Sequence, residues 1–136
     1  MNLSVYQTKA TGTFKPGGKL DAEGARLCDW ALGVAGEAGE LVGLIKHHVF
    51  HRQRLNKMEV AKEVGDVLWY LSALCQSLDI NIADCAELNI AKLQHRHEGS
   101  FSFRGSANRK EAEVRFEETG VYEEFERRIL RIDTCE

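Results

Sequence analysis

The stretch GVAGEAGELVGLI, residues 33–45, carries two carboxylates, Glu37 and Glu40, among apolar residues and glycines. Residues three apart on an α-helix share a face, with Cβ atoms about 5–6 Å apart. Apolar residues recur at helical intervals through this region, and Glu37 lies at the edge of their stripe. Four glycines within eleven residues each cost a helix about 1 kcal/mol relative to alanine. They indicate either tight packing of a neighbouring helix or room for a ligand beside the carboxylates.

A second stretch, AKEVGDVLWYL at residues 61–71, repeats the spacing with Glu63 and Asp66. If the chain reverses around residues 52–57, the two helices run antiparallel and the two acidic pairs can meet. Such pairs are also common on solvated helix faces, but carboxylates at the edge of a core are costly unless paired or bound to metal. A hard divalent cation relieves the repulsion among four acids. The pattern predicts a Mg²⁺ site, which Mn²⁺ can also fill.

Composition narrows the class of protein. The length of 136 residues fits one domain with a modest core. A net charge of -3 gives no basic field, so we expect no nucleic-acid partner. No apolar run reaches the roughly 18–20 residues that span a bilayer, and the N-terminus has no signal-peptide pattern. Four cysteines without a Cys-x-x-Cys pair favour free thiols in a reducing compartment. We therefore expect a cytoplasmic protein that binds no membrane.

The chain is expected to be all-α, because no segment alternates with period two and Pro16 is its one proline. Residues 1–103 are expected to form the domain. Residues 104–136 are expected to be a charged C-terminal tail, either with a short amphipathic helix or mobile. The expected helices cover residues 3–10, from Asp21 to about His48, 58–78, and from the cap Asn81 to about His97, with a turn over Val49–Lys57.

The third long helix supplies positive charge. Asn89, Lys92 and Arg96 recur at three- and four-residue steps and share a face. They could complete a metal shell and hold phosphates, although a solvated basic edge is the alternative. His47 and His51 have helical zinc-ligand spacing, but the helix is expected to fray there. Exposed histidines in a basic, phosphate-steering turn are the preferred interpretation.

Three motifs resemble the MazG-like nucleotide pyrophosphohydrolases of the all-α NTP pyrophosphatase superfamily. They are GEAGEL (36–41), KEVGDVLWYL (62–71) and NIAKLQHR (89–96), and the resemblance covers about residues 3–103. It implies a MazG-like helical bundle completed by oligomerisation, as a homo-tetramer or alternatively a homodimer. The implied reaction is Mg²⁺-dependent hydrolysis of an NTP or dNTP to the monophosphate and pyrophosphate, for nucleotide-pool control or house-cleaning.

The resemblance also implies roles for residues. Lys92 and Arg96 take positions that contact phosphates, with Asn89 nearby. Glu37 is our choice for the group that accepts the proton of the attacking water. The positions of the metal ligands are taken by Glu37, Glu40, Glu63 and Asp66.

Base recognition is expected near the start of the helix that carries Glu37 and Glu40. Asp29 lies one and two turns before Gly33 and Glu37 on one face, where it could meet the sugar or base of a nucleotide. Trp30 or Trp69 could supply an apolar wall against the base. Ordinary core or interface packing is the alternative for Trp30.

Two other classes use similar residues. A di-iron carboxylate bundle needs Glu-x-x-His pairs, and the sequence has none. A non-catalytic helical interaction module could keep the acids as salt-bridge partners. Release of pyrophosphate that depends on Mg²⁺ separates this alternative from the enzyme.

Overall fold

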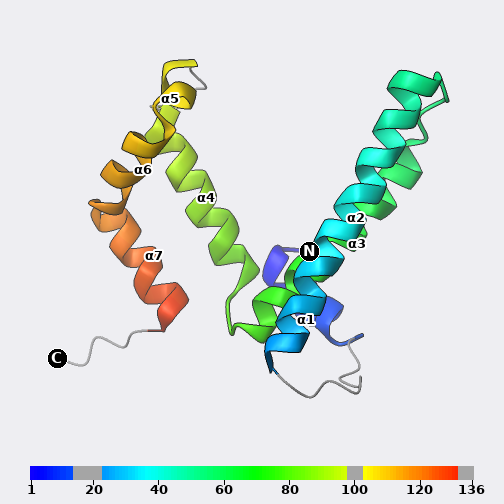
Figure 1. The fold of residues 1–136 in the computed structure, drawn as a ribbon. Helices are drawn as coiled ribbons and strands as arrows, with labels where there is room; N and C mark the ends of the chain where they lie inside the picture. Colours follow the sequence, from blue (N-terminus) through cyan, green and yellow to red (C-terminus); the bar gives the residue numbers. More distant parts are fainter. Residues whose placement is uncertain (14–22, 98–102, 132–136) are drawn as a thin grey trace. The chain divides into compact units, whose positions relative to one another are not determined.

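The computed structural model describes residues 1–13, 23–97 and 103–131, and over these ranges it is all-α, as predicted. It divides into two compact units, Met1–Asp79 and Ile80–Glu136. No described helix is long and apolar enough to cross a membrane. The helices in chain order are α1 (Leu3–Thr11), α2 (Glu23–His51), α3 (Lys57–Ser77), α4 (Ile82–His97), α5 (Phe103–Ala107), α6 (Arg109–Glu117) and α7 (Gly120–Leu130) (Figure 1).

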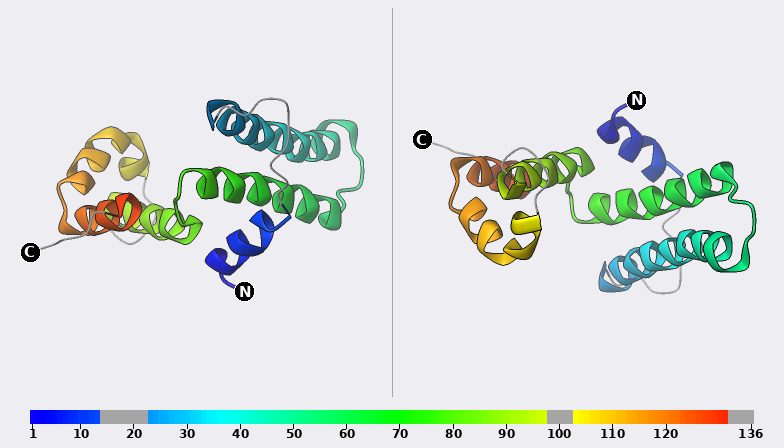
Figure 2. Two further views of the ribbon diagram at one scale, coloured as in Figure 1. Left: turned by 90° about the horizontal axis from the view of Figure 1, so that it is seen from below. Right: turned by 90° about the horizontal axis from the view of Figure 1, so that it is seen from above.

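In the first unit α3 is the central helix. It packs against α2 on one side and α1 on the other (Figure 2). The chain reverses between α2 and α3 over residues 52–56, where Arg52 has a left-handed backbone with φ 53°. The side chain of Asn56 caps α3 by accepting a hydrogen bond of 3.0 Å from the Met58 N–H. The reversal is therefore as predicted, although α2 continues through His51, beyond its expected end near His48.

The first unit has a small core built around aromatic rings. Trp30 is buried, and its ring centroid lies 5.7 Å from that of Trp69 and 6.3 Å from that of Tyr70. Trp69 and Tyr70 pack edge to face at 4.9 Å, a favourable aromatic geometry. Outside this cluster, α2 and α3 keep large apolar side chains exposed. These include Leu32, Val42, Val49, Phe50, Met58 and Val64.

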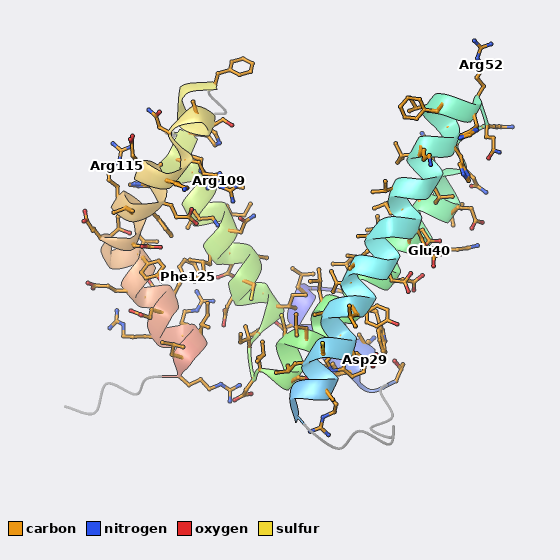
Figure 3. All side chains as sticks on the ribbon, viewed as in Figure 1. Asp29, Glu40, Arg52, Arg109, Arg115 and Phe125 are labelled. Atoms are coloured by element: carbon orange, nitrogen blue, oxygen red, sulfur yellow. The ribbon has the colours of Figure 1, made fainter. Side chains whose placement is uncertain are left out.

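The second unit is built on α4, which contacts α5, α6 and α7. The predicted cap forms, because the Asn81 side chain accepts a hydrogen bond of 2.9 Å from the Ala83 N–H. Buried Phe116 and Phe125 hold α6 and α7 in place, and Phe125 is labelled in Figure 3. Most of the expected charged tail is therefore helical.

Several expectations fall outside the described residues. They concern most of the loop expected over residues 11–20, the helix start at Asp21 and the helix stop at Gly99.

Candidate metal centre

Three of the four predicted carboxylates converge in the first unit. Glu37 comes from α2, while Glu63 and Asp66 come from α3. One oxygen of each carboxylate lies within 4.8 Å of the others. The convergence follows from the sequence, because antiparallel helices bring a face of α2 opposite a face of α3, and the three-residue spacing keeps Glu63 and Asp66 on one side.

The surroundings of Glu37 change its proton affinity. Loss of water around this half-buried carboxyl raises its pKa above the ordinary value, and three neighbouring carboxylates raise it further. In decreasing order those neighbours are Glu40, Asp66 and Glu63. The raised pKa of Glu37 thus reflects loss of water first and the gathered negative charge second.

Glu40 lies outside the set of converging oxygens. It is exposed on α2 (Figure 3), and the three-carboxylate group does not include it. It still stands one turn from Glu37 and adds to the raised pKa of that residue. The structure therefore brings three predicted ligands together and places the fourth at their margin.

The glycines of α2 divide between the two predicted roles. A Cβ built on Gly33 would overlap the ring of Tyr70, so this glycine permits close packing of α3. A Cβ on Gly36 or Gly39 would meet nothing within 4 Å. Close packing against Tyr70 thus explains Gly33. Gly36 and Gly39, which come directly before Glu37 and Glu40, instead face open space.

Tyr6 of α1 reaches the same region. Its hydroxyl donates a hydrogen bond of 3.2 Å to the backbone carbonyl of Gly65. Burial raises the pKa of Tyr6, and the negative charge of Asp66 raises it further. The position of Tyr6 beside the acids could not be predicted from the sequence, because the contact joins residues 59 positions apart and helical periodicity does not reveal such contacts.

The residues predicted to meet the nucleobase have different surroundings. Asp29 is exposed on α2 (Figure 3). Trp30 is only 8% exposed, and its indole N–H donates a hydrogen bond of 3.1 Å to the Ser77 hydroxyl. The half-buried Trp69 donates one of 2.9 Å to the hydroxyl of Thr13. Trp30 therefore packs in the core, which was the alternative interpretation of this residue.

Asn89, Lys92 and Arg96 lie on α4, in the second unit. Asn89 is exposed. The Lys92 Nζ lies 3.7 Å from the Glu113 Oε1 of α6. The Nε and Nη2 atoms of Arg96 are buried and have no hydrogen-bond partner among the described residues. Whether these side chains meet the carboxylates of the first unit stays a prediction.

The histidines at the tip of the α2–α3 hairpin lie on ordered helix rather than on a frayed end. The rings of His47 and His51 are 5.2 Å apart, and His48 Nδ1 lies 2.8 Å from the Gln53 carbonyl oxygen. All three histidines are exposed. Within the described part of the chain, the carboxylate cluster is the one group of three or more candidate metal ligands.

Comparison with known proteins agrees with this geometry. The family model of the MazG nucleotide pyrophosphohydrolase domain matches residues 29–101, which is more than half of the chain and spans every predicted site residue. The protein belongs to this family. It is also 29% identical over 101 residues to the Gene 37 protein of Mycobacterium phage L5, an alignment that covers 71% of this chain and 89% of the phage protein. No solved structure gives a significant match.

A divalent cation fits the donor set of this MazG domain. Mg²⁺ prefers hard oxygen ligands and keeps waters and substrate phosphates in its remaining positions. One oxygen each from Glu37, Glu63 and Asp66 lies within a space of 4.8 Å, and all three residues are carboxylates on ordered helices. A bound cation would also offset the mutual repulsion that raises the pKa of Glu37.

Proposed function

We propose that this MazG-family protein hydrolyses a nucleoside triphosphate, NTP or dNTP, between its α- and β-phosphates, and so releases the monophosphate and pyrophosphate. The observation that carries the proposal is the convergence of Glu37, Glu63 and Asp66 from two antiparallel helices. The family match over residues 29–101 supports the reaction class.

The metal ligands are Glu37, Glu63 and Asp66, joined by Glu40 from the next turn of α2. Mg²⁺, or Mn²⁺ in its place, supplies charge neutralisation and Lewis acidity at the phosphates when bound. Three helical carboxylates fix its position because their spacing is set by backbone geometry. The open space at Gly36 and Gly39 leaves room for phosphates beside them.

Glu37 accepts the proton of the attacking water. The water oxygen bonds to the α-phosphorus as the bond to the bridging oxygen breaks, and pyrophosphate leaves with that oxygen. Glu37 is placed for this role because its carboxylate converges with those of Glu63 and Asp66, where the cation and the attacking water would be held. Glu63 and Asp66 then serve chiefly as ligands.

The substrate is held at both ends. Lys92 and Arg96 contact the phosphates, with Asn89 beside them, because a triphosphate carries charge that cations must offset. Asp29 meets the sugar or base. Trp69 supplies the apolar wall more directly than Trp30, whose ring is largely covered by the core.

The working form is a homo-oligomer, a tetramer in preference to a dimer. Leu32 is 67% exposed and Phe50 is 78% exposed in the single chain, and large apolar surfaces of this kind mark interaction sites. A second copy of the α2–α3 hairpin would cover them. The role in the cell is control or cleaning of the cytoplasmic nucleotide pool.

Pyrophosphate release from a panel of NTPs and dNTPs tests the proposal. Release should require Mg²⁺ or Mn²⁺ and stop in EDTA, and the second product should be the nucleoside monophosphate. Orthophosphate plus a diphosphate would contradict cleavage at the α–β bond. No turnover of any triphosphate would favour the non-catalytic interaction module instead.

A further inference from the structure

The helix α6 packs against α4 and contacts the face that carries Lys92. Ala112 and Phe116 are buried, and the Phe116 ring centroid lies 5.6 Å from that of His95. These two residues flank Glu113 on α6. Their burial fixes α6 against α4 in the register that brings the Glu113 carboxylate to the Lys92 ammonium, at 3.7 Å.

Glu113 therefore provides the negative charge that a phosphate would bring to Lys92. The Lys92 side chain is 27% exposed, so most of its surface is already covered. One turn along α4, Arg96 keeps Nε and Nη2 buried with no hydrogen-bond partner in the described part of the chain. Buried guanidinium donors are costly to leave unpaired. One cation of the pair is thus offset by a tail carboxylate, and the other keeps unused donors.

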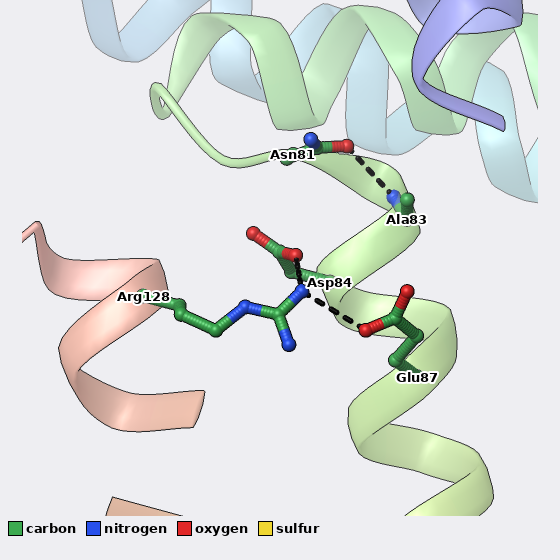
Figure 4. Close-up of polar contacts among 5 residues, drawn as sticks. All are labelled: Asn81, Ala83, Asp84, Glu87 and Arg128. Carbon is green, nitrogen blue, oxygen red and sulfur yellow. Dashed lines mark hydrogen bonds and ion pairs between the residues drawn. The ribbon is translucent and has the colours of Figure 1, made fainter. Parts of the chain in front are cut away.

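A second ionic contact holds the tail to α4 at the other end. Arg128 of α7 pairs with Asp84, and its Nη2 lies 2.9 Å from the Glu87 Oε2 (Figure 4). The Arg128 guanidinium also lies 4.9 Å from the centroid of the buried Phe125 ring. The two contacts are reciprocal: a tail acid meets a base of α4, and a tail base meets acids of α4.

We infer that the α6–α7 segment, residues 109–130, competes with the anionic substrate for the cations of α4. Glu113 pairs with Lys92 until a triphosphate displaces it. The inference rests on the proposed function, because it takes Lys92 and Arg96 as the residues that contact phosphate. The second unit then has two states. In the closed state α6 is seated on α4, and in the open state both cations are available to the substrate.

The ion pair itself is easily displaced, whereas the burial of Ala112 and Phe116 keeps molecules with α6 unseated in the minority. A partly exposed ion pair contributes little to stability, whereas a triphosphate offers several negative charges to the same two cations. The substrate can therefore displace one carboxylate, at a cost in apparent affinity. The apparent Kd rises by a factor equal to the reciprocal of the fraction of molecules in the open state.

Two substitutions in the full chain should each favour the open state, one in α6 and one in α7. Glu113→Gln removes the competing charge, and the KM for the triphosphate should fall by about two- to fivefold, the range expected for one partly exposed ion pair. Arg128→Ala releases α7 without touching Lys92 or Arg96, and it should lower KM by a similar factor. The second variant is the sharper test, because loss of a cation would otherwise weaken the binding of an anion and raise KM.

Neighbouring residues of the same type give matched controls. Arg127 lies beside Arg128, but its Nε donates a hydrogen bond of 3.3 Å to the Glu123 carbonyl within α7. Glu117 is exposed on α6, one turn from Glu113. Arg127→Ala and Glu117→Gln should leave KM within a factor of two of the wild-type value. A KM that stays at or above the wild-type value in Arg128→Ala overturns the inference.

Hydrogen exchange measured by mass spectrometry tests displacement without turnover. Saturating inorganic tripolyphosphate, added without Mg²⁺, should speed amide exchange in α6 of the wild-type protein. Unchanged exchange in α6 would overturn the inference even if the enzyme is active. If no triphosphate is hydrolysed but exchange in α6 rises, the proposed function fails while the competition between Glu113 and an anion stands.

Discussion

The phenol ring of Tyr70 on α3 lies directly against the backbone of Gly33 on α2, in space that any side chain at position 33 would need. The ring has little freedom to move, because Trp69 packs edge to face on it at 4.9 Å. This approach sets the separation of the two helices one turn before Glu37, so it helps to position the carboxylate cluster.

Gly33→Ala should therefore destabilise the protein by about 1–3 kcal/mol, the usual cost of adding a methyl group to a packed contact. Gly43→Ala is the matched control on the same helix, because a Cβ there meets nothing within 4 Å. That substitution should stabilise the protein by up to about 1 kcal/mol through helix propensity. Urea unfolding of both variants measures the two effects, and a stabilised Gly33→Ala would contradict the close packing.

Removing one of the four proposed ligand carboxylates should abolish Mg²⁺-dependent turnover. Glu63→Gln, Asp66→Asn and Glu40→Gln are each expected to lower kcat/KM at least about 100-fold, since even an outer-shell change at a metal site costs 10- to 100-fold. Glu59→Gln is the control, because Glu59 lies one turn before Glu63 on α3 and pairs with Lys62 at 2.9 Å. Full activity in Glu63→Gln or Asp66→Asn would refute the ligand assignment.

The raised pKa of Glu37 predicts a pH effect on the metal-free protein. The folded state binds the Glu37 proton more tightly than the unfolded state does, so this linkage favours folding at low pH. The advantage is lost as pH rises from the ordinary glutamate value, about 4.3, through the raised value. In EDTA, the melting temperature of Glu37→Gln minus that of the wild type should therefore grow as pH rises through this window. A difference that does not change with pH would contradict the raised pKa.

The site was predictable to the extent that helical spacing determines it. The repeated three-residue spacing of Glu37 with Glu40 and Glu63 with Asp66 depends on helix geometry alone, and a short turn is enough to bring the pairs together. Helical spacing could not separate Glu40 from the three carboxylates that converge, because periodicity does not determine side-chain rotamers.

Tertiary contacts explain what the sequence did not predict. The hydrogen bond from Tyr6 to the Gly65 carbonyl depends on where α1 docks. The helix α6 depends on the burial of Phe116, whose ring packs beside His95 of α4. Phe116 stands in a run of charged residues, where its burial could not be read from local pattern, whereas α7 is the short amphipathic helix that was one of the two expectations for the tail. Trp30 shows the reverse case: packing in the core was one of its two interpretations, and its burial, its contact with the Trp69 ring and its hydrogen bond to Ser77 confirm it.

The apolar residues left exposed on the first unit predict self-association. Val42 and Met58, at 64% and 68% exposure, belong to the α2–α3 hairpin and have no cover in the single chain. Light scattering at micromolar concentration should give a mass near four chains of 15.3 kDa, with two chains as the alternative. A mass near one chain would refute the prediction, and Met58→Lys should shift the protein toward smaller species.

Asp29 is the candidate for recognition of the base. It precedes Glu37 by eight residues on α2, which is about 12 Å along a helix, a separation that suits a base at one end of a nucleotide and phosphates at the other. Asp29→Ala should therefore change the ranking of nucleotides, with the ratio of kcat/KM between the best and second base falling about 2- to 10-fold, as expected for one lost hydrogen bond. Glu59→Gln, assayed on the same panel, should keep the wild-type ranking. An equal loss for every triphosphate would place base recognition elsewhere, with α1 the next segment to test because Tyr6 already lies beside the acids.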